Sequence, residues 1–220
     1  MKGLIIAATE FEINTCIRAI KNSSHWQPVI TGIGGVATAY AVMKAITQYR
    51  PQIMIQAGIA GSFDRQLALK SVVIAGSECF GDLGVVENKK RRSVFDMNLL
   101  QSNQKPFTDG RLYNPHTKLL QAAALPVVNA VTVNEVTTAN ADIRHYKNDL
   151  NAAIETMEGA AFHYVALMEQ IAFLQIRSIS NYVGERDKQK WQLQPAINNL
   201  NNEVLKLIEA IEPGKNNNEQ

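Results

Sequence analysis

Short apolar runs alternate with stretches of helical spacing along the 220 residues of the chain. Runs rich in Val, Ile and Ala predict buried strands at 3–8, 28–31, 53–56, 72–76, 127–133, 154–157 and 173–180. Apolar positions three and four residues apart predict helical segments at 13–20, 36–49, 119–124, 158–170 and 191–211. Because apolar strands that alternate with helices are covered on both faces, the pattern predicts an α/β sandwich.

Neither an internal repeat nor a linker interrupts this alternation, so we expect a single domain over residues 1–212. Residues 213–220 are polar and are expected to form a frayed, disordered tail. Residues 81–115 contain few apolar runs, which predicts a long excursion from the sheet.

The balance of charge argues against a nucleic-acid partner. The chain has 22 basic and 20 acidic residues, which gives a formal net charge of +2. Four of the basic residues are consecutive, at 89–92, and such a run is typical of a solvated loop. The rest of the surface is therefore expected to be close to neutral.

The sequence also predicts a soluble, cytoplasmic protein. No segment reaches the apolar length that a bilayer requires, and the first apolar run is too short for a signal peptide and is followed by acids. Cys16 and Cys79 are far apart and cannot form a disulfide framework, which favours a reducing compartment. No His, Cys and Asp cluster has the spacing of metal ligands, so no metal is expected.

A glycine-rich segment at 32–37 (GIGGVA) formally fits the G-x-G-x-x-A pattern of dinucleotide-binding proteins. That mechanism also needs an acid about 20 residues further on, to hold the ribose hydroxyls. The corresponding stretch, 51–56, has no carboxylate, and the phosphate-loop pattern is absent from the sequence. The segment is interpreted as a tight turn between a strand and a helix.

Ligands of open α/β sheets bind beyond the carboxyl ends of the strands. At those ends lie two acids after the first strand, a small-residue stretch after the third, and two further polar segments: Glu10, Glu12, 57–62, 157–161 and 180–182. The four histidines fall elsewhere, which argues against a Ser-His or Cys-His nucleophile. The chemistry that remains is a carboxylate general base together with a hydrogen-bond donor.

These segments carry a resemblance to a known family. The stretches TEFE (9–12), TGIG (31–34), AGIAG (57–61), MEGAA (157–161) and SN (180–181) resemble, in order and spacing, the purine nucleosidase/phosphorylase superfamily. The likeness to its methylthioadenosine/S-adenosylhomocysteine nucleosidase branch extends from residue 1 to about 210. Segments 157–165 and 180–187 most resemble the futalosine hydrolases, which remove hypoxanthine from futalosine in an alternative menaquinone pathway.

The resemblance implies a nucleoside phosphorylase-like, three-layer sandwich whose central sheet is mixed and mostly parallel. It also implies a reaction without metal or organic cofactor, and a homodimer in which the partner closes the pocket for the 5′ group. The small molecule bound would be a purine nucleoside.

The resemblance further assigns roles to individual residues. Breaking an N-glycosidic bond builds positive charge on the ribose and negative charge on the purine, so a base for water and a donor to the purine are needed. By resemblance, Glu12 is the base and Glu158 accepts hydrogen bonds from both ribose hydroxyls. Met157 would pack beneath the sugar, while Ala60 and Gly61 would offer backbone N–H groups to the water or sugar. Taken alone, Glu12 could equally be an acid at a helix N-terminus, with Glu10 as a cap or solvated neighbour.

Asn181 departs from the nucleosidase branch, which has an Asp at this place. An Asn cannot act as an acid, but its NH₂ can donate to N7 or O6 of a 6-oxopurine. The same residue occurs in the 6-oxopurine phosphorylases of the superfamily. Asn181 therefore favours hypoxanthine as the leaving group. The alternatives are an adenine-releasing nucleosidase, acting on methylthioadenosine, S-adenosylhomocysteine or 6-amino-6-deoxyfutalosine, and a non-catalytic nucleoside-binding protein.

Two further predictions concern the nucleophile and the 5′ group. Glu10 and Glu12 would repel phosphate, and Arg18 lies one turn too far to neutralise both, so water is the expected nucleophile. Arg186 is a candidate to recognise the benzoate of futalosine, with a solvated charged loop as an equal alternative. Residues 133–135 are expected to border the purine, in a register that the sequence leaves open.

Overall fold

The computed structural model describes residues 1–88 and 90–211, and the predicted tail at 213–220 lies outside this part of the chain. The helices are α1 (Glu10–Ala19), α2 (Gly35–Tyr49), α3 (Thr117–Ala122), α4 (Asn140–Arg144), α5 (Gly159–Met168) and α6 (Leu193–Ile211), with short turns η1 (His145–Asp149) and η2 (Lys188–Lys190). The strands are β1 (Gly3–Ala7), β2 (Trp26–Ile30), β3 (Ile53–Ser62), β4 (Val72–Glu78), β5 (Gly84–Glu87), β6 (Lys90–Ser93), β7 (Leu112–Tyr113), β8 (Val127–Thr132), β9 (Ile154–Thr156) and β10 (Ala172–Tyr182).

The central sheet is mixed and mostly parallel, as predicted, but it does not form the middle layer of a simple sandwich. Strand β3 pairs with β10, β10 with β4, β4 with β8, β8 with β9, and β9 returns to β3. These five strands form a closed barrel, and β1 and β2 extend the sheet from the other edge of β3. The prediction of a three-layer sandwich was therefore wrong for this part of the molecule.

The barrel closes because β3 and β10 are longer than predicted. The apolar runs ended at residues 56 and 180, whereas the strands continue to Ser62 and Tyr182. The first half of β3 pairs with β1 and its last two residues pair with β9. A register shift between Ile179 and Asn181 bends the second long strand, as β-bulges do. Ala60 and Gly61 consequently lie within a strand and not in the loop that the sequence predicted.

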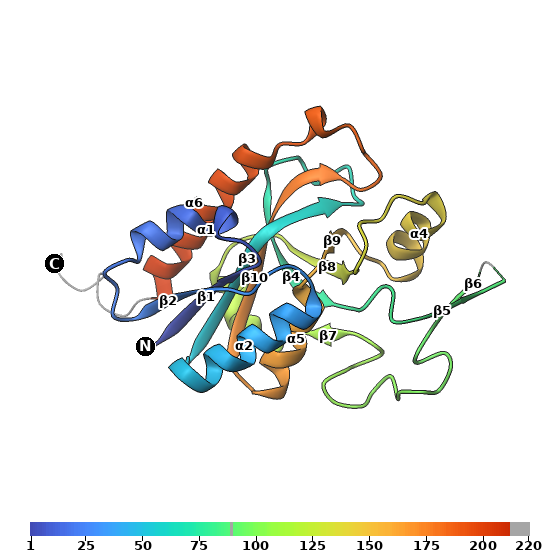
Figure 1. Ribbon diagram of the computed structural model, residues 1–220, viewed down its shortest axis with the longest axis horizontal. Coiled ribbons are helices and arrows are strands. Elements are labelled where there is room, and N and C mark those ends of the chain that lie inside the picture. Colours follow the sequence, from blue (N-terminus) through green and yellow to red (C-terminus); the bar gives the residue numbers. More distant parts are fainter. Residues whose placement is uncertain (89, 212–220) are drawn as a thin grey trace.

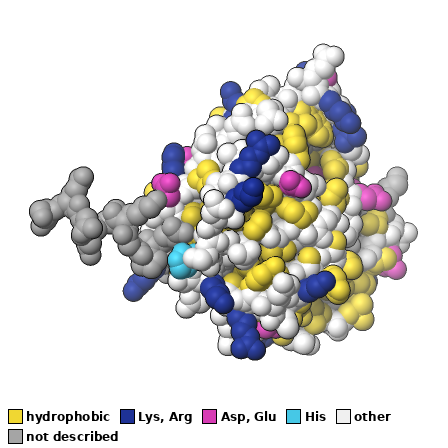
Figure 2. All heavy atoms as spheres, turned by 60° about the vertical axis from the view of Figure 1, so that its left-hand side comes forward, with side chains coloured by type: hydrophobic (Ala, Val, Ile, Leu, Met, Phe, Trp, Pro, Cys, Tyr) yellow, Lys and Arg dark blue, Asp and Glu magenta, His cyan; other side chains and the backbone are white. Residues whose placement is uncertain are grey.

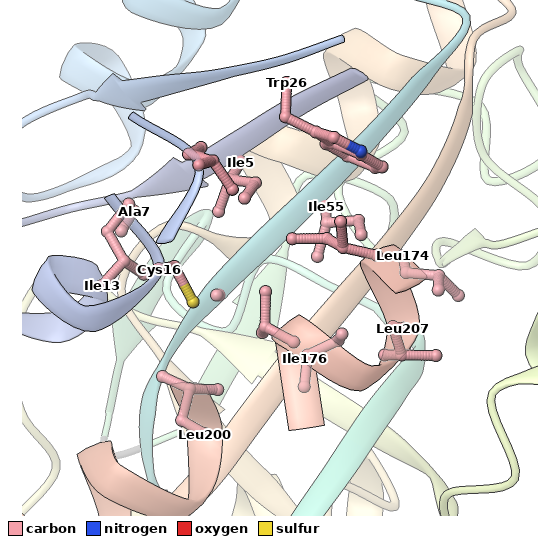
Figure 3. Packing of buried hydrophobic residues seen from close by; sticks show 14 of the residues in the cluster. Ile5, Ala7, Ile13, Cys16, Trp26, Ile55, Leu174, Ile176, Leu200 and Leu207 are labelled. Carbon is pink, nitrogen blue, oxygen red and sulfur yellow. The ribbon is translucent and has the colours of Figure 1, made fainter. Parts of the chain in front are cut away.

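Helices cover both faces of the sheet near β1 and β2 (Figure 1), where α1 and α6 lie on one side and α2 and α5 on the other. On the α1 and α6 side, the packed residues include Ile5, Trp26, Ile55, Leu200 and Leu207 (Figure 3). Each fully buried aliphatic or aromatic side chain of this kind stabilises the fold by about 1.5–3 kcal/mol. This packing holds the strand ends that carry the predicted site residues.

The segment 81–115 forms the expected excursion, with the two-stranded β5–β6 sheet and the short strand β7. It is tied to α4, an element that the sequence analysis missed, by an ion pair between Arg91 and Asp142 at 2.8 Å. On the face drawn in Figure 2, the Lys and Arg side chains are scattered and do not gather in one patch. No helix within the described ranges is long and apolar enough to cross a membrane.

Candidate active site

A cavity of about 360 Å³ opens at the carboxyl ends of β1, β3, β9 and β10. Six of the seven predicted site residues line it: Glu12, Ala60, Gly61, Met157, Glu158 and Asn181. Strand ends far apart in the sequence therefore meet at one rim, as the sequence analysis expected. Apolar side chains complete the walls: Phe11, Ile33, Val136, Trp191 and Leu193.

The carboxylate of Glu12 is held in place by the start of its own helix and by β3. Its Oε2 accepts hydrogen bonds from the N–H and the hydroxyl of Thr9, at 3.1 and 3.0 Å, in a capping box. Its Oε1 accepts from the N–H of Ile59, at 3.1 Å. The side chain is buried, whereas Glu10 in the same turn is exposed. A carboxylate fixed on both oxygens still has lone pairs free to meet a ligand or a water molecule.

A buried arginine that the sequence analysis missed lies beside both cavity carboxylates. Arg177, on β10, is 2 % exposed and donates from Nη2 to Gln56 at 3.0 Å. Its Nη1 lies 3.8 Å from Oε2 of Glu158. A Cβ at Gly58 would overlap this guanidinium and would lie 2.9 Å from Oε1 of Glu12. The positive charge offsets the repulsion between two buried carboxylates. A lone Arg in the apolar run 173–180 was the signal available in the sequence.

Glu158 sits at the N-cap of α5 and is linked to the glycine-rich turn. Its Oε1 accepts the N–H of Gly34 at 3.1 Å, and Gly34 has φ +92°, a conformation that favours glycine. The segment is thus a strand-to-helix turn, as interpreted from the sequence. It also positions a cavity carboxylate.

Threonine hydroxyls satisfy the first amides of α5, so that the Glu158 side chain is not used to cap its own helix. Oγ1 of Thr156 accepts from the N–H of Gly159 at 3.2 Å, and Oγ1 of Thr132 accepts from that of Ala160 at 2.7 Å. The Glu158 carboxylate is left facing the cavity.

Both threonine hydroxyls donate to Glu78, a fully buried carboxyl group at the end of β4, at 3.0 Å each. Gln175 donates to it as well, at 2.8 Å. Burial raises the pKa of Glu78, while its hydrogen bond with Gln175 and the charge of Arg177 act in the opposite direction. A Cβ at Gly159 would overlap the Glu78 carboxyl, so this helix must begin with glycine. Sequence analysis missed Glu78, which extends one of the predicted strands.

Asn181 stands at the end of β10 with its amide partly engaged. Its Oδ1 accepts from the hydroxyl of Ser180 at 2.8 Å, and its Nδ2 donates to the carbonyl of Tyr182 at 3.2 Å. The second N–H of this amide remains available to a ligand. Within the expected stretch 133–135, Val133 packs into a neighbouring core cluster and the next two residues are exposed. Val136 borders the cavity in their place.

Arg186 is not brought to the cavity with the other predicted residues. It is exposed on the loop after β10 and is absent from the cavity lining. Tyr182, which was expected near it, turns away and donates to the carbonyl of Leu67 at 3.2 Å. Trp191 does line the cavity, and its Nε1 donates to the carbonyl of Glu185 at 3.1 Å. The loop that carries Arg186 is therefore anchored next to the cavity.

Fold and cavity together define an α/β protein with a small-molecule site made of two carboxylates, one buried guanidinium and one carboxamide. Within residues 1–88 and 90–211, no group of three or more His, Cys, Asp or Glu side chains could hold a metal ion. The chain belongs to the phosphorylase superfamily, whose family model matches residues 27–211.

Individual relatives divide between two kinds of nucleosidase. Futalosine hydrolase of Thermus thermophilus is 25 % identical over 81 % of this chain and 79 % of its own length. The 5′-methylthioadenosine/S-adenosylhomocysteine nucleosidase of Shewanella baltica is 30 % identical over 82 % of this chain and 84 % of its own length.

Solved structures show the same fold. Futalosine hydrolase of Helicobacter pylori has a TM-score of 0.82 at 14 % identity, covering 96 % of this chain and 98 % of that one. The nucleosidase of Colwellia psychrerythraea in complex with adenine has a TM-score of 0.82 at 22 % identity, with 96 % of both chains covered.

Proposed function

We propose that this protein hydrolyses the N-glycosidic bond of a purine nucleoside that carries a 6-oxopurine, with futalosine as the substrate. The products would be hypoxanthine and dehypoxanthine futalosine. The observation that carries the proposal is the meeting of Glu12, Glu158 and Asn181 on one cavity, in a chain of this superfamily. Relatives named futalosine hydrolase support the choice of substrate.

The proposed mechanism divides the work between the two ends of the cavity. A water molecule attacks C1′ while Glu12 takes its proton, and the bond between C1′ and N9 breaks. Glu158 accepts hydrogen bonds from the ribose hydroxyls, with Met157 beneath the sugar and the backbone of Ala60 and Gly61 beside it. The free N–H of Asn181 donates to N7 or O6 as negative charge develops on the purine.

Water is proposed as the nucleophile because the sugar end of the cavity carries two carboxylates. Arg177 is the buried cation there, and its guanidinium is already engaged by Gln56 and lies next to Glu158. The test is incubation with futalosine, inosine and methylthioadenosine without phosphate, with identification of the products. A requirement for phosphate together with release of ribose-1-phosphate from inosine would contradict hydrolysis.

The second candidate function is adenine release. It is favoured by the adenine complex of the Colwellia nucleosidase and by the Shewanella relative. Analysis of the free base decides between the two, since hypoxanthine is expected and adenine alone would remove the argument from Asn181. The homodimer and the cytoplasmic location stay predictions, and sedimentation in solution tests the first.

Replacing Asn181 by Asp is expected to shift the preference toward 6-aminopurines. The Tyr182 carbonyl, 3.2 Å from Nδ2, would face a carboxyl oxygen and favour its protonated form, which can donate to N7. We expect the ratio of kcat/KM for 6-amino-6-deoxyfutalosine over that for futalosine to rise about 10-fold or more, the effect of one strong hydrogen bond. An unchanged ratio in a folded N181D variant would contradict the proposed contact.

Replacing Arg186 by Ala tests recognition of the 5′ group. We expect KM for futalosine to rise several-fold, since a charge-assisted contact to the benzoate is lost, while KM for inosine stays the same. Steady-state kinetics on both nucleosides measure this. Lys188→Ala, an exposed cation of the same loop, is the matched control. Equal effects of R186A on both substrates would count against the role.

A further inference from the structure

We propose that Glu155 determines the choice of base, by accepting the N1–H of the 6-oxopurine through its second carboxyl oxygen. The inference rests on the proposed function, since it places a purine between Glu155 and Asn181. Sequence analysis did not single out Glu155, which lies in β9 immediately before the segment that carries Met157 and Glu158.

Strand pairing places Glu155 and Asn181 on one face of the barrel wall. Gly61 is paired with Glu155 on one side and with Asn181 on the other. Paired residues project to the same face of a sheet, and neighbouring strands lie about 4.8 Å apart. The two polar side chains therefore flank a glycine, about 10 Å apart at their Cα atoms by that spacing. All three residues line the cavity.

The glycine between them keeps this space open. A Cβ at Gly61 would lie 3.4 Å from Nδ2 of Asn181 and 3.0 Å from a methyl group of Val183. Any larger side chain would enter the space that separates the amide from the carboxyl group. The edge of a flat heterocycle fits such a gap, with one polar group at each side.

Glu155 has the features of a side chain that waits for a partner. It is only 7 % exposed, and its Oε1 accepts from the N–H of Thr137 at 3.1 Å. Its Oε2 is buried and has no hydrogen-bond partner within the described residues. Leaving such an atom unpaired costs about 1–3 kcal/mol, so a purely structural role would be unfavourable. Burial also raises the pKa of Glu155.

The chemistry of the base then gives the selectivity. A 6-oxopurine presents a donor at N1 and acceptors at O6 and N7, which match a carboxylate oxygen and the N–H of Asn181. A 6-aminopurine presents a bare lone pair at N1, which a carboxylate repels. The pair of side chains thus both selects hypoxanthine and disfavours adenine.

The test compares futalosine with 6-amino-6-deoxyfutalosine as substrates of the whole protein and of E155Q. If the amide oxygen of Gln keeps the Thr137 contact, its NH₂ replaces Oε2 and becomes a donor to N1. We expect kcat/KM for futalosine to fall about 10–100-fold, while that for the amino analogue is unchanged or rises. Glu169→Gln, an exposed glutamate at the end of α5, is the control and should alter neither value.

Equal losses on both substrates, or no loss on futalosine, would overturn the role of Glu155 while hypoxanthine release by the unmodified protein still upheld the proposed function. Release of no base from either substrate would overturn both. A second measurement avoids any effect of the substitution on folding. Wild-type protein should cleave 1-methylinosine, which lacks the N1–H, at least about 10-fold less efficiently than inosine. Equal cleavage of the two would also overturn the proposal.

Discussion

Glu12→Gln is expected to lower kcat by about 10²–10⁴-fold, the range typical of a lost general base, with little effect on folding or nucleoside binding. Gln preserves the shape of the side chain and is accepted in a capping box, so the contact with Thr9 can persist. An amide cannot take a proton from water, which is the step that the proposal assigns to the carboxylate. Initial rates of hypoxanthine release and calorimetric binding of the nucleoside measure the two effects separately.

Glu10→Gln supplies the matched control. The same substitution is made two residues earlier, in the same turn, but on an exposed side chain outside the cavity. This variant should retain nearly full turnover. Undiminished turnover in E12Q would refute the assignment of the base. Tight binding of nucleosides without turnover in the unmodified protein would instead favour a binding protein on the same fold.

Acidification is expected to destabilise the protein through His163, by about 3 kcal/mol between pH 7 and pH 4. This side chain is fully buried on α5, where it packs against Phe173 with 4.7 Å between ring centroids. Its Nδ1 lies 3.1 Å from the carbonyl of Leu112, and its Nε2 has no partner in the described part of the chain. Burial lowers the pKa of His163 to about 3, and the charges of Arg177 and Arg111 act in the same direction.

The sign follows from where the proton binds. In the unfolded chain the imidazole has a pKa near 6.5, whereas the folded protein keeps it neutral until about pH 3. The contribution to stability is therefore fully present above pH 6.5 and is lost as the pH falls through this window. Chemical denaturation at pH 7 and pH 4 measures the loss, which should be smaller in His163→Gln.

His25→Gln is the control for this measurement, because His25 is exposed and should leave the pH dependence unchanged. If H163Q lost as much stability on acidification as the unmodified protein, the buried imidazole would not be responsible. The titration of Glu78, whose pKa is raised by burial, acts with the opposite sign above its ordinary pKa and is common to both proteins.

The candidate site could be predicted as far as it depends on strand ends. Glu12 follows the first strand within a capping-box pattern, and Glu158 and Asn181 end later strands, so topology alone brings them to one rim. Arg177, Glu78 and Glu155 escaped sequence analysis because each acts through partners remote in the sequence. A charged residue in an apolar strand has no evident role until its neighbours across the sheet are known.

By itself, the sequence determined the order of helices and strands, the parallel character of the sheet and the residues at the strand ends. These features follow from local apolar periodicity and from the resemblance of short segments. Only the tertiary structure decided that five strands close into a barrel, that a buried guanidinium separates the carboxylates, and that Arg186 stays outside the cavity. Such outcomes depend on which strands pair over long distances and how far they coil, and the period of a single segment does not record either.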